Sequence, residues 1–525
     1  MEGNTLFDWR KVELFLFGTG LFIMRQKKFA FNAITSFFLQ VTTIICGFIL
    51  PRMIMTSYGS NVNGLLNSIA QFLSVITFLE FGIGAVIQSA LYAPLVRQDF
   101  LSVSKIWVSG NKFFRKIAYI LLVYIVFLTI CYPALFQQQF NWLYEATLIL
   151  MISVSTFVQY YFGAMDGLLL SADQRGYIQY IIQIIIVLSN TIISVILIWC
   201  GASIHLVKGA TSLIYLARPF FLRWYTNRYY ALDRKICYTE EPVKNKLSGA
   251  MQHIAYMILN GTDIIVLTLC STLENVSVYS VYNLVISGLK QVFTILDNSF
   301  HALIGELWAR QDISKLNYIF GIMEWIFHTV AVFVFGCALV LMIPFVIVYT
   351  NGITDADYVQ PLFSVLITLS CMINLLSYPY KILILVAGHF RETQWKFFIS
   401  AILNMAISLF SVWKFGLVGV AAGTLIAMIY QDIWMIWYVS KHLNHWSLEK
   451  VLKQFFVDAV SFGIGLILSR SFELSEYTYI AWGVLAVKTA LVWIAIVAGI
   501  NLLFYRDKVI WILERGKEVV EKIRK

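Results

Sequence analysis

Polar and ionisable side chains recur on one face of the apolar segment at residues 276–305. Six of them stand three or four positions apart, which is the spacing of one side of an α-helix: Asn283, Ser287, Lys290, Thr294, Asp297 and His301. At about 100° per residue, four fall within about 40° of one another, namely Asn283, Lys290, Asp297 and His301. A lone charge in an apolar helix is unfavourable, so such residues pair or face a polar cavity. The stripe predicts a cavity wall that binds a polar or anionic ligand, with a buried Lys290–Asp297 pair as the alternative.

The apolar segment at residues 62–91 carries a matching stripe without charge: Asn63, Asn67, Gln71 and Ser74. Amide and hydroxyl groups of this kind can solvate sugar hydroxyls. Two acids, Glu80 and Asp263, also lie well inside apolar segments. Each of them is a candidate ion-coupling or gating residue, or half of a buried pair, and Asp297 is a third candidate for ion coupling or gating.

Two further cations could serve an anionic ligand. Arg52 follows Pro51 near the end of an apolar segment, and Lys208 lies near the end of another. Either side chain could instead extend to the membrane surface, as long cationic side chains do. With Lys290, they are the candidate contacts for a phosphate group.

No arrangement of residues in the sequence predicts catalysis. The chain lacks a His-Glu-x-x-His motif and a glycine-rich phosphate loop, and its seven histidines and seven cysteines are dispersed. We therefore expect a protein that is not an enzyme and that needs neither a metal nor a cofactor.

The composition defines the elements that must position these side chains. The chain has 525 residues, of which 59% are hydrophobic and only 13% charged. Soluble domains carry about 25% charged residues, which argues against a cytosolic enzyme or a nucleic-acid-binding module. The net charge of +10 comes from lysines and arginines that one orientation places mostly on the cytoplasmic side. We predict an all-α polytopic membrane protein with about 14 transmembrane helices and both termini in the cytoplasm.

An internal repeat divides the predicted helices. Residues about 214 positions apart match in order along the chain: Asn61 with Asn275, Arg97-Gln98-Asp99 with Arg310-Gln311-Asp312, Arg175 with Arg391, Asn190 with Asn404, Ser194 with Ser408, and Gly209-Ala210-Thr211 with Gly423-Thr424. Six helices per repeat predict two pseudo-symmetric lobes of the same orientation, a parallel repeat found in secondary transporters.

The repeat and the charges predict six regions. They are an N-terminal cytoplasmic or interfacial segment at 1–28, an N-lobe at 29–222, a basic cytoplasmic linker at 223–249, a C-lobe at 250–439, an appended helix pair at 455–505 and a basic cytoplasmic tail at 506–525. The basic residues of the linker are interpreted as a topology signal. Two predicted spans of the C-lobe, 395–413 and 415–439, are joined by a turn at Phe415-Gly416.

Four short stretches resemble bacterial polysaccharide biosynthesis flippases, the O-antigen-type repeat-unit translocases of the multidrug, oligosaccharidyl-lipid and polysaccharide exporter superfamily. The stretches are Leu79-Glu80-Phe81-Gly82, residues 260–266, residues 278–283 and residues 387–393. The resemblance implies two six-helix lobes, alternating access, and undecaprenyl-pyrophosphate carrying a short glycan as substrate. Lipid II flippases of this superfamily have fourteen helices, the last two of which form a groove for the lipid tail. The sequence lacks their several arginines in the first two helices and retains only Arg52.

The expected function is therefore flipping of lipid-linked oligosaccharide repeat units across the bacterial cytoplasmic membrane for surface polysaccharide biosynthesis. A pyrophosphate cannot cross hydrocarbon unaided, because burial of its charges is highly unfavourable. The expected partners are the lipid bilayer, the lipid-linked glycan and the polymerase or glycosyltransferase machinery, with no nucleic acid. The alternative is a multidrug/cation antiporter of the same fold, for which an acid is expected in the first helix. That helix has none.

Overall fold

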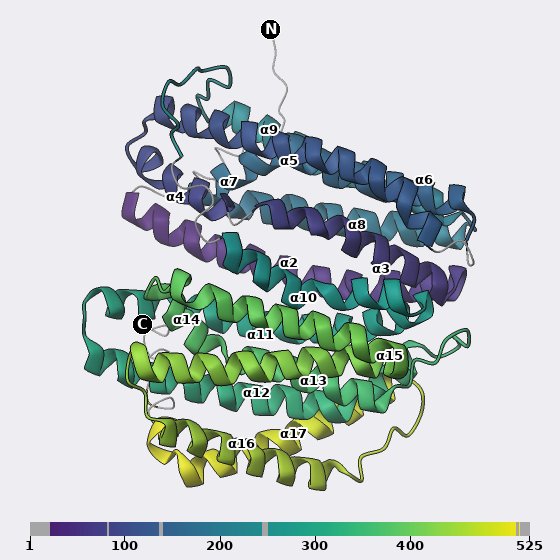
Figure 1. The fold of residues 1–525 in the computed structure, drawn as a ribbon, viewed down its shortest axis with the longest axis vertical. Helices are drawn as coiled ribbons and strands as arrows, with labels where there is room; N and C mark the ends of the chain where they lie inside the picture. The colour runs from purple at the N-terminus through teal and green to yellow at the C-terminus, as the bar shows by residue number, and fades with distance from the viewer. Residues whose placement is uncertain (1–20, 81–82, 136–139, 244–249, 511–513, 515–525) are drawn as a thin grey trace. The chain divides into compact units, whose positions relative to one another are not determined.

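The computed structural model describes residues 21–80, 83–135, 140–243, 250–510 and 514 (Figure 1). Within these ranges the chain forms helices and no strands, which confirms the predicted all-α fold class. The N-terminal segment up to residue 20, Phe81-Gly82, part of the linker (244–249) and most of the tail lie outside the described residues. Residues 21–28, predicted as part of the terminal segment, form the first turns of a long helix.

In the described ranges, nine helices are long and apolar enough to cross a membrane. Several are longer than the roughly 20 residues that one crossing requires. The protein is a multi-pass membrane protein, and the count of about 14 spans stays a prediction.

The chain divides into two compact units, which we call unit 1 (residues 1–53 and 73–250) and unit 2 (residues 54–72 and 251–525). The helices of unit 1 are α2 (Leu21–Tyr58, through residue 53), η1 (Val75–Glu80), α4 (Ile83–Val96), α5 (Phe100–Leu135), α6 (Trp142–Val158), η2 (Gln159–Gly163), α7 (Ala164–Ala172), α8 (Gly176–Trp199) and α9 (Ile204–Tyr229). Those of unit 2 are α3 (Ser60–Ser74, through residue 72), α10 (Ala250–Cys270), α11 (Leu273–Ala309), α12 (Ile313–Tyr349), α13 (Pro361–Leu376), α14 (Tyr378–Val386), α15 (Phe390–His442), α16 (Leu448–Ser469) and α17 (Tyr479–Phe504). The predicted lobe boundaries stay predictions.

Helix α3 is held in unit 2 by polar side chains. The Asn63 amide donates to the Ser277 hydroxyl on α11 at 2.8 Å. At the start of α3, the Ser60 backbone N–H and hydroxyl both donate to Asp355 at 2.6 Å. Gly64 packs directly on the α11 backbone, because an added Cβ would lie 1.8 Å from the Leu273 carbonyl oxygen. Such close helix contact is typical of small residues in membrane interfaces.

Helix α15 is a hairpin of two antiparallel arms. Its joint is Gly416, whose φ of 52° lies in the left-handed region that favours glycine. Beyond the joint the arms touch, since a Cβ at Gly419 would lie 2.6 Å from the Ser411 carbonyl and one at Gly423 would lie 2.5 Å from the Ser408 hydroxyl. The structure thus places the turn where the sequence predicted it.

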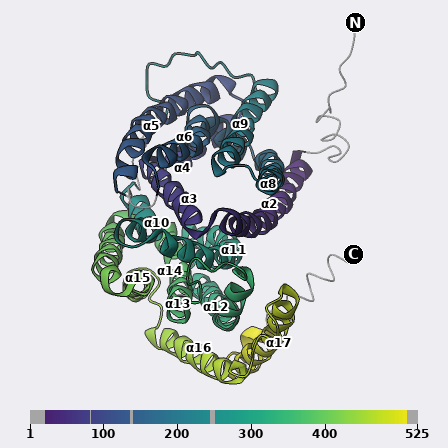
Figure 2. The same cartoon turned by 90° about the vertical axis from the view of Figure 1, so that its right-hand side faces the viewer.

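Helices α16 and α17 pack on α12, and Figure 2 shows the three helices of unit 2 nearly end-on. Two buried contacts join the pair to α12: His328 Nδ1 lies 2.5 Å from the Asp458 carboxylate on α16, and Trp325 Nε1 donates to Asn501 on α17 at 2.5 Å. The fully buried Trp493 ring fills the space above Gly336, where an added Cβ would lie 2.0 Å from it. The appended pair is therefore an integral part of unit 2.

Candidate functional site

The main candidate site is a polar cluster inside unit 2, centred on Asp263 of α10. The Asp263 side chain is 8% exposed. Its carboxylate accepts a hydrogen bond from the Tyr279 hydroxyl on α11 at 3.0 Å and from the Thr424 hydroxyl on α15 at 3.0 Å to each oxygen. We call the residues Asp263, Tyr279, Asn404, Ser408 and Thr424 the Asp263 cluster.

The α15 hairpin positions the cluster. The Ser408 hydroxyl of the first arm donates to the Asn404 amide oxygen at 3.0 Å, and the Thr424 hydroxyl of the second arm lies 3.3 Å from the same oxygen. Gly423 allows the arms to approach this closely. The Asn404 amide nitrogen donates to the Leu259 carbonyl on α10 at 3.2 Å. Two helices and both arms of the hairpin therefore fix the oxygen atoms around Asp263.

A small cavity of about 40 Å³ adjoins the carboxylate and is also lined by Asn283 and Lys290. The Lys290 ammonium acts electrostatically on the Asp263 carboxylate. A cavity needs about 10–15 Å³ to hold one water, so this one has room for a water or one small cation. Within unit 2, the structure thus brings together three of the predicted site residues, Asp263, Asn283 and Lys290.

Asp297 and His301 lie elsewhere. They line a separate cavity of about 570 Å³ between α11 and α14, which Lys381 also lines. Lys381 interacts electrostatically with Asp297, and His301 is exposed. The structure does not form the Lys290–Asp297 pair that was the alternative, because Lys290 acts on Asp263 and Asp297 acts on Lys381. Residues seven apart on a helix are separated by two turns, about 10 Å along the axis, which is too far for a direct pair of this kind.

The amides of α3 are used to hold helices together. The Gln71 amide donates to the Gly261 carbonyl on α10 at 2.9 Å, two residues before Asp263. The Asn67 amide donates to the Asn63 carbonyl one turn earlier at 2.8 Å. Contact of these residues with a substrate stays a prediction.

The remaining predicted residues belong to unit 1. The Tyr160 hydroxyl in the π-helical turn η2 donates to the Glu80 carboxylate. Arg52 is half-buried in the last part of α2, and Lys208 is half-buried one turn after the start of α9. Their proposed contacts with an anion stay predictions.

Sequence reasoning did not assign a chemical role to Tyr279, Asn404, Ser408 or Thr424. The last three were visible as members of the internal repeat, and that was the signal that could have found them. In unit 1, the linker residue Arg234 pairs with the fully buried Asp166 at 3.0 Å and lies 4.2 Å from the centre of the Trp107 ring. This linker arginine therefore has a structural partner, which its interpretation as a topology signal did not predict.

The oxygen atoms of the Asp263 cluster suit a small hard cation. They comprise one carboxylate, hydroxyls and an amide oxygen, the ligand types that hard cations prefer. In the described part of the chain, no group of three or more His, Cys, Asp or Glu side chains could hold a metal ion. One carboxylate with neutral oxygen ligands fits a monovalent cation or a proton better than a divalent metal.

In a multi-pass membrane protein, ionisable side chains at an intramembrane cavity mark a candidate functional site. The sequence matches no family model and no curated protein. Among solved structures, the fold is similar to "Lipid II flippase MurJ, inward closed conformation", with a TM-score of 0.66 and 13% identity over 91% of this chain and 99% of that chain. It is also similar to "Inward-facing conformation of a multidrug resistance MATE family transporter of the MOP superfamily", with a TM-score of 0.54 and 14% identity over 76% of this chain and 94% of that chain. The chain has the fold of these transporters.

Proposed function

We propose that the protein is a flippase that moves undecaprenyl-pyrophosphate-linked oligosaccharide units across the bacterial cytoplasmic membrane by alternating access. The observation that carries the proposal is the extent of the fold likeness, which covers 91% of this chain and 99% of the lipid II flippase. The likeness to the multidrug transporter covers 76% of this chain. The tight packing of α16 and α17 on α12 supports a function that uses the appended pair.

The proposal includes a coupling step at the Asp263 cluster. Without a bound cation, the Lys290 ammonium neutralises the Asp263 carboxylate across their shared cavity. A cation that binds the carboxylate displaces this interaction, since two positive charges at one small site repel each other. Lys290 is then available to the pyrophosphate of the substrate, as a point charge without fork geometry. Cation and substrate binding thereby favour each other, and the coupling is reciprocal.

The other predicted residues have supporting roles in this proposal. Arg52 and Lys208 add positive charge for the pyrophosphate, and the amides of Asn67, Gln71 and Asn283 contact sugar hydroxyls. His301 is a further substrate contact, whereas Glu80 and Asp297 contribute to gating.

The direct test is flipping of a fluorescent undecaprenyl-pyrophosphate oligosaccharide by the full-length protein in proteoliposomes. The proposal predicts that label on the inner leaflet becomes accessible to a membrane-impermeant quencher faster than in protein-free vesicles, and faster still with a sodium or proton gradient. As a control, Lys488→Gln should flip the lipid at the wild-type rate, since this α17 lysine lies over the Phe472 ring, outside the Asp263 cavity. Rates equal to those of empty vesicles, from folded protein, would contradict the proposal.

A multidrug/cation antiporter is the second candidate. The fold likeness to a multidrug transporter and the single carboxylate of the Asp263 cluster favour it. Efflux of a cationic dye from the same vesicles, driven by the ion gradient, separates the two candidates. Dye efflux without lipid flipping would establish the antiporter and overturn the flippase.

A further inference from the structure

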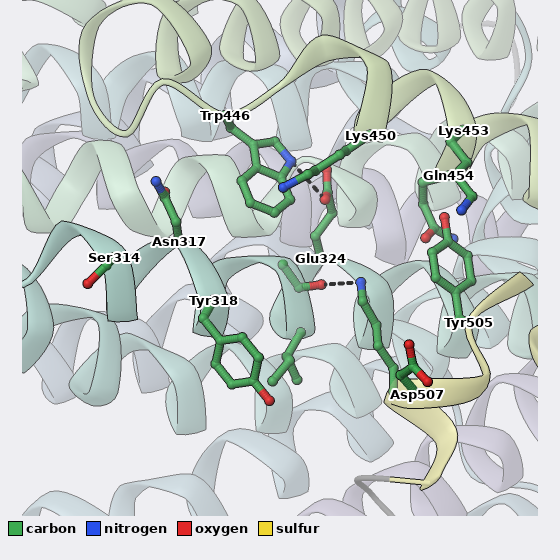
Figure 3. A pocket seen from close by; sticks show the side chains of 13 residues that line it. Ser314, Asn317, Tyr318, Glu324, Trp446, Lys450, Lys453, Gln454, Tyr505 and Asp507 are labelled. Atoms are coloured by element: carbon green, nitrogen blue, oxygen red, sulfur yellow. Dashed lines mark hydrogen bonds between the residues drawn. The ribbon is translucent and has the colours of Figure 1, made fainter.

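A third cavity in unit 2, of about 590 Å³, lies at one end of its helices, apart from the Asp263 cluster. Its walls come from the first turns of α12, the start of α16 and the residues directly after α17 (Figure 3). The topology predicted from the charges places this end on the cytoplasmic side. The proposed flippase function does not use this cavity.

Three lysines converge on the cavity. The Lys450 ammonium lies 4.5 Å from the centre of the Trp446 ring, while Lys453 and Lys508 lie 5.1 and 4.9 Å from the centre of the Tyr505 ring. Lys453 is on α16 and Lys508 follows α17, so two elements bring an ammonium group to the same tyrosine. Within the described ranges, none of the three lysines forms an ion pair with a carboxylate.

The three ammonium groups repel one another, so each makes the positive charge of the other two less favourable. The pKa of Lys508 is lowered to about 8, mainly by burial; the Glu324 carboxylate raises it, and the positive charges of Lys450 and Lys453 contribute to the lowering. An anion bound among the three lysines would offset this repulsion, because it interacts favourably with each of them.

Glu324 does not neutralise the cavity by direct contact with the lysines. Its carboxylate accepts hydrogen bonds from the Tyr380 hydroxyl and from Trp446 Nε1, the latter at 2.9 Å. The Lys508 ammonium donates instead to the Gly321 carbonyl at 2.8 Å. Figure 3 shows Lys450 and Lys453 extending from α16, and the Glu324 carboxylate bonded to Trp446. Asp507 also lines the cavity and is exposed. The cavity lining therefore contains three lysines and two acids.

The elements around the cavity also carry exposed apolar side chains suited to lipid tails. Leu452 and Phe456 on α16 are 69% and 59% exposed, and Leu503 at the end of α17 is 81% exposed. The Phe456 and Phe504 rings lie edge to face with centroids 6.5 Å apart and join the two helices. Tryptophan and tyrosine at helix ends, like Trp446 and Tyr505, are typical of the headgroup level of a membrane.

We propose that this cavity binds a phosphate-bearing anion, with its phosphate among Lys450, Lys453 and Lys508. The exposed apolar residues on α16 and at the end of α17 favour a membrane lipid as the source of the phosphate over a soluble phosphate. The acyl chains of such a lipid lie along α16 and the end of α17.

The test is lipid retention by the purified full-length protein in native mass spectrometry. The protein is delipidated and then offered phosphatidylglycerol or phosphatidylcholine at equal concentration. We expect phosphatidylglycerol to be retained at least about tenfold better, since lysines near a membrane surface attract anionic lipid. The triple variant Lys450→Gln, Lys453→Gln, Lys508→Gln should lose this preference, and the corresponding triple arginine variant should keep it.

The matched control changes three other lysines of unit 2, none of which lines the cavity: Lys315→Gln, Lys396→Gln and Lys441→Gln. Equal retention by the wild type and the triple glutamine variant, or equal loss in the control, would overturn the proposal. A second arm offers inorganic diphosphate and follows the thermal unfolding midpoint. Stabilisation by diphosphate that depends on the three lysines, without lipid retention, would confirm the phosphate chemistry and overturn the lipid source.

Discussion

Units 1 and 2 contain the same asparagine–serine pair one helical turn apart. Asn190 and Ser194 on α8 of unit 1 are 7% and 3% exposed, and Asn404 and Ser408 on α15 of unit 2 are 0% and 1% exposed. In both, the serine hydroxyl lies near the asparagine amide oxygen, at 3.5 Å in unit 1 and 3.0 Å in unit 2. Among the contacts described for these two pairs, only those of unit 2 include a carboxylate, that of Asp263. The same sequence offset that relates the two pairs makes Ile49 the counterpart of Asp263 in unit 1. Ile49 is apolar and 39% exposed.

The difference indicates what the repeat supplies and what the proposed function adds. The paired amide and hydroxyl groups satisfy one another inside an apolar helix bundle, which makes them a structural feature available to both units. A carboxylate at such a position is unfavourable without a cation or a proton. We therefore expect ion dependence to reside in unit 2 alone.

The largest expected effect comes from Asp263→Asn. The substitution keeps the size of the side chain and removes the charge that binds the cation. Loss of about 3 kcal/mol of interaction corresponds to about a 100-fold weaker apparent affinity for the coupling ion. Transport rates measured against sodium concentration and pH give this value. A variant with unchanged ion dependence would remove the proposed difference between the units.

Lys290→Ala should stop substrate transport while the protein remains folded. The proposed role needs a point charge, so Lys290→Arg should keep part of the activity. Accumulation of lipid-linked glycan on the cytoplasmic leaflet is the measurement, with protein abundance in the membrane as the control. If abundance falls and the surviving molecules transport normally, Lys290 serves only to neutralise Asp263.

Asn404→Ala and Asn190→Ala compare the units directly. Each removes a buried amide and should lower the thermal unfolding midpoint, because a buried partner left without its hydrogen bond is unfavourable by about 1–3 kcal/mol. Only Asn404→Ala should also weaken the apparent ion affinity, by about tenfold. An equal effect of Asn190→Ala on ion affinity would place a second coupling site in unit 1.

The smallest effects concern a feature that the units share. Asp99 precedes α5 and Asp312 precedes α12, and both follow a glutamine with φ of 57°. Hydrogen bonds from Ser102 lower the pKa of Asp99, and those from Lys315 and Ser314 lower the pKa of Asp312. A depressed folded-state pKa stabilises the protein above the unfolded pKa near 3.8, and this contribution is lost as pH falls through the lower value.

Asp99→Ala and Asp312→Ala should therefore each lower the thermal unfolding midpoint slightly at pH 7. The difference from the wild type should shrink as the pH is lowered below about 4. Midpoints measured across this range by intrinsic fluorescence test the prediction. A destabilisation that grows at low pH would show that these carboxylates have another role.

The sequence predicted the helical class because apolar runs must satisfy their backbone hydrogen bonds internally. It also placed the turn near Gly416 and identified Asp263, Asn283 and Lys290 as candidate site residues. These predictions depend on local pattern, since depth in an apolar segment and position on a helix face can be counted along the chain.

The sequence could not assign partners to these residues. The face of α11 is shared by Lys290 and Asp297, but a helix of 37 residues passes different neighbours at each level. Lys290 meets α10 and Asp297 meets α14, and only tertiary packing determines this. The same applies to Arg234, whose buried partner Asp166 lies 68 positions away.

The α15 hairpin has a consequence for biosynthesis. Its two arms are joined at a single glycine and press together at Gly419 and Gly423. A first arm inserted alone would leave Asn404 and Ser408 facing lipid without their partners on the second arm. We therefore expect the insertion machinery to release both arms into the bilayer together, so that the oxygen atoms of the second arm reach the site in the same event as those of the first.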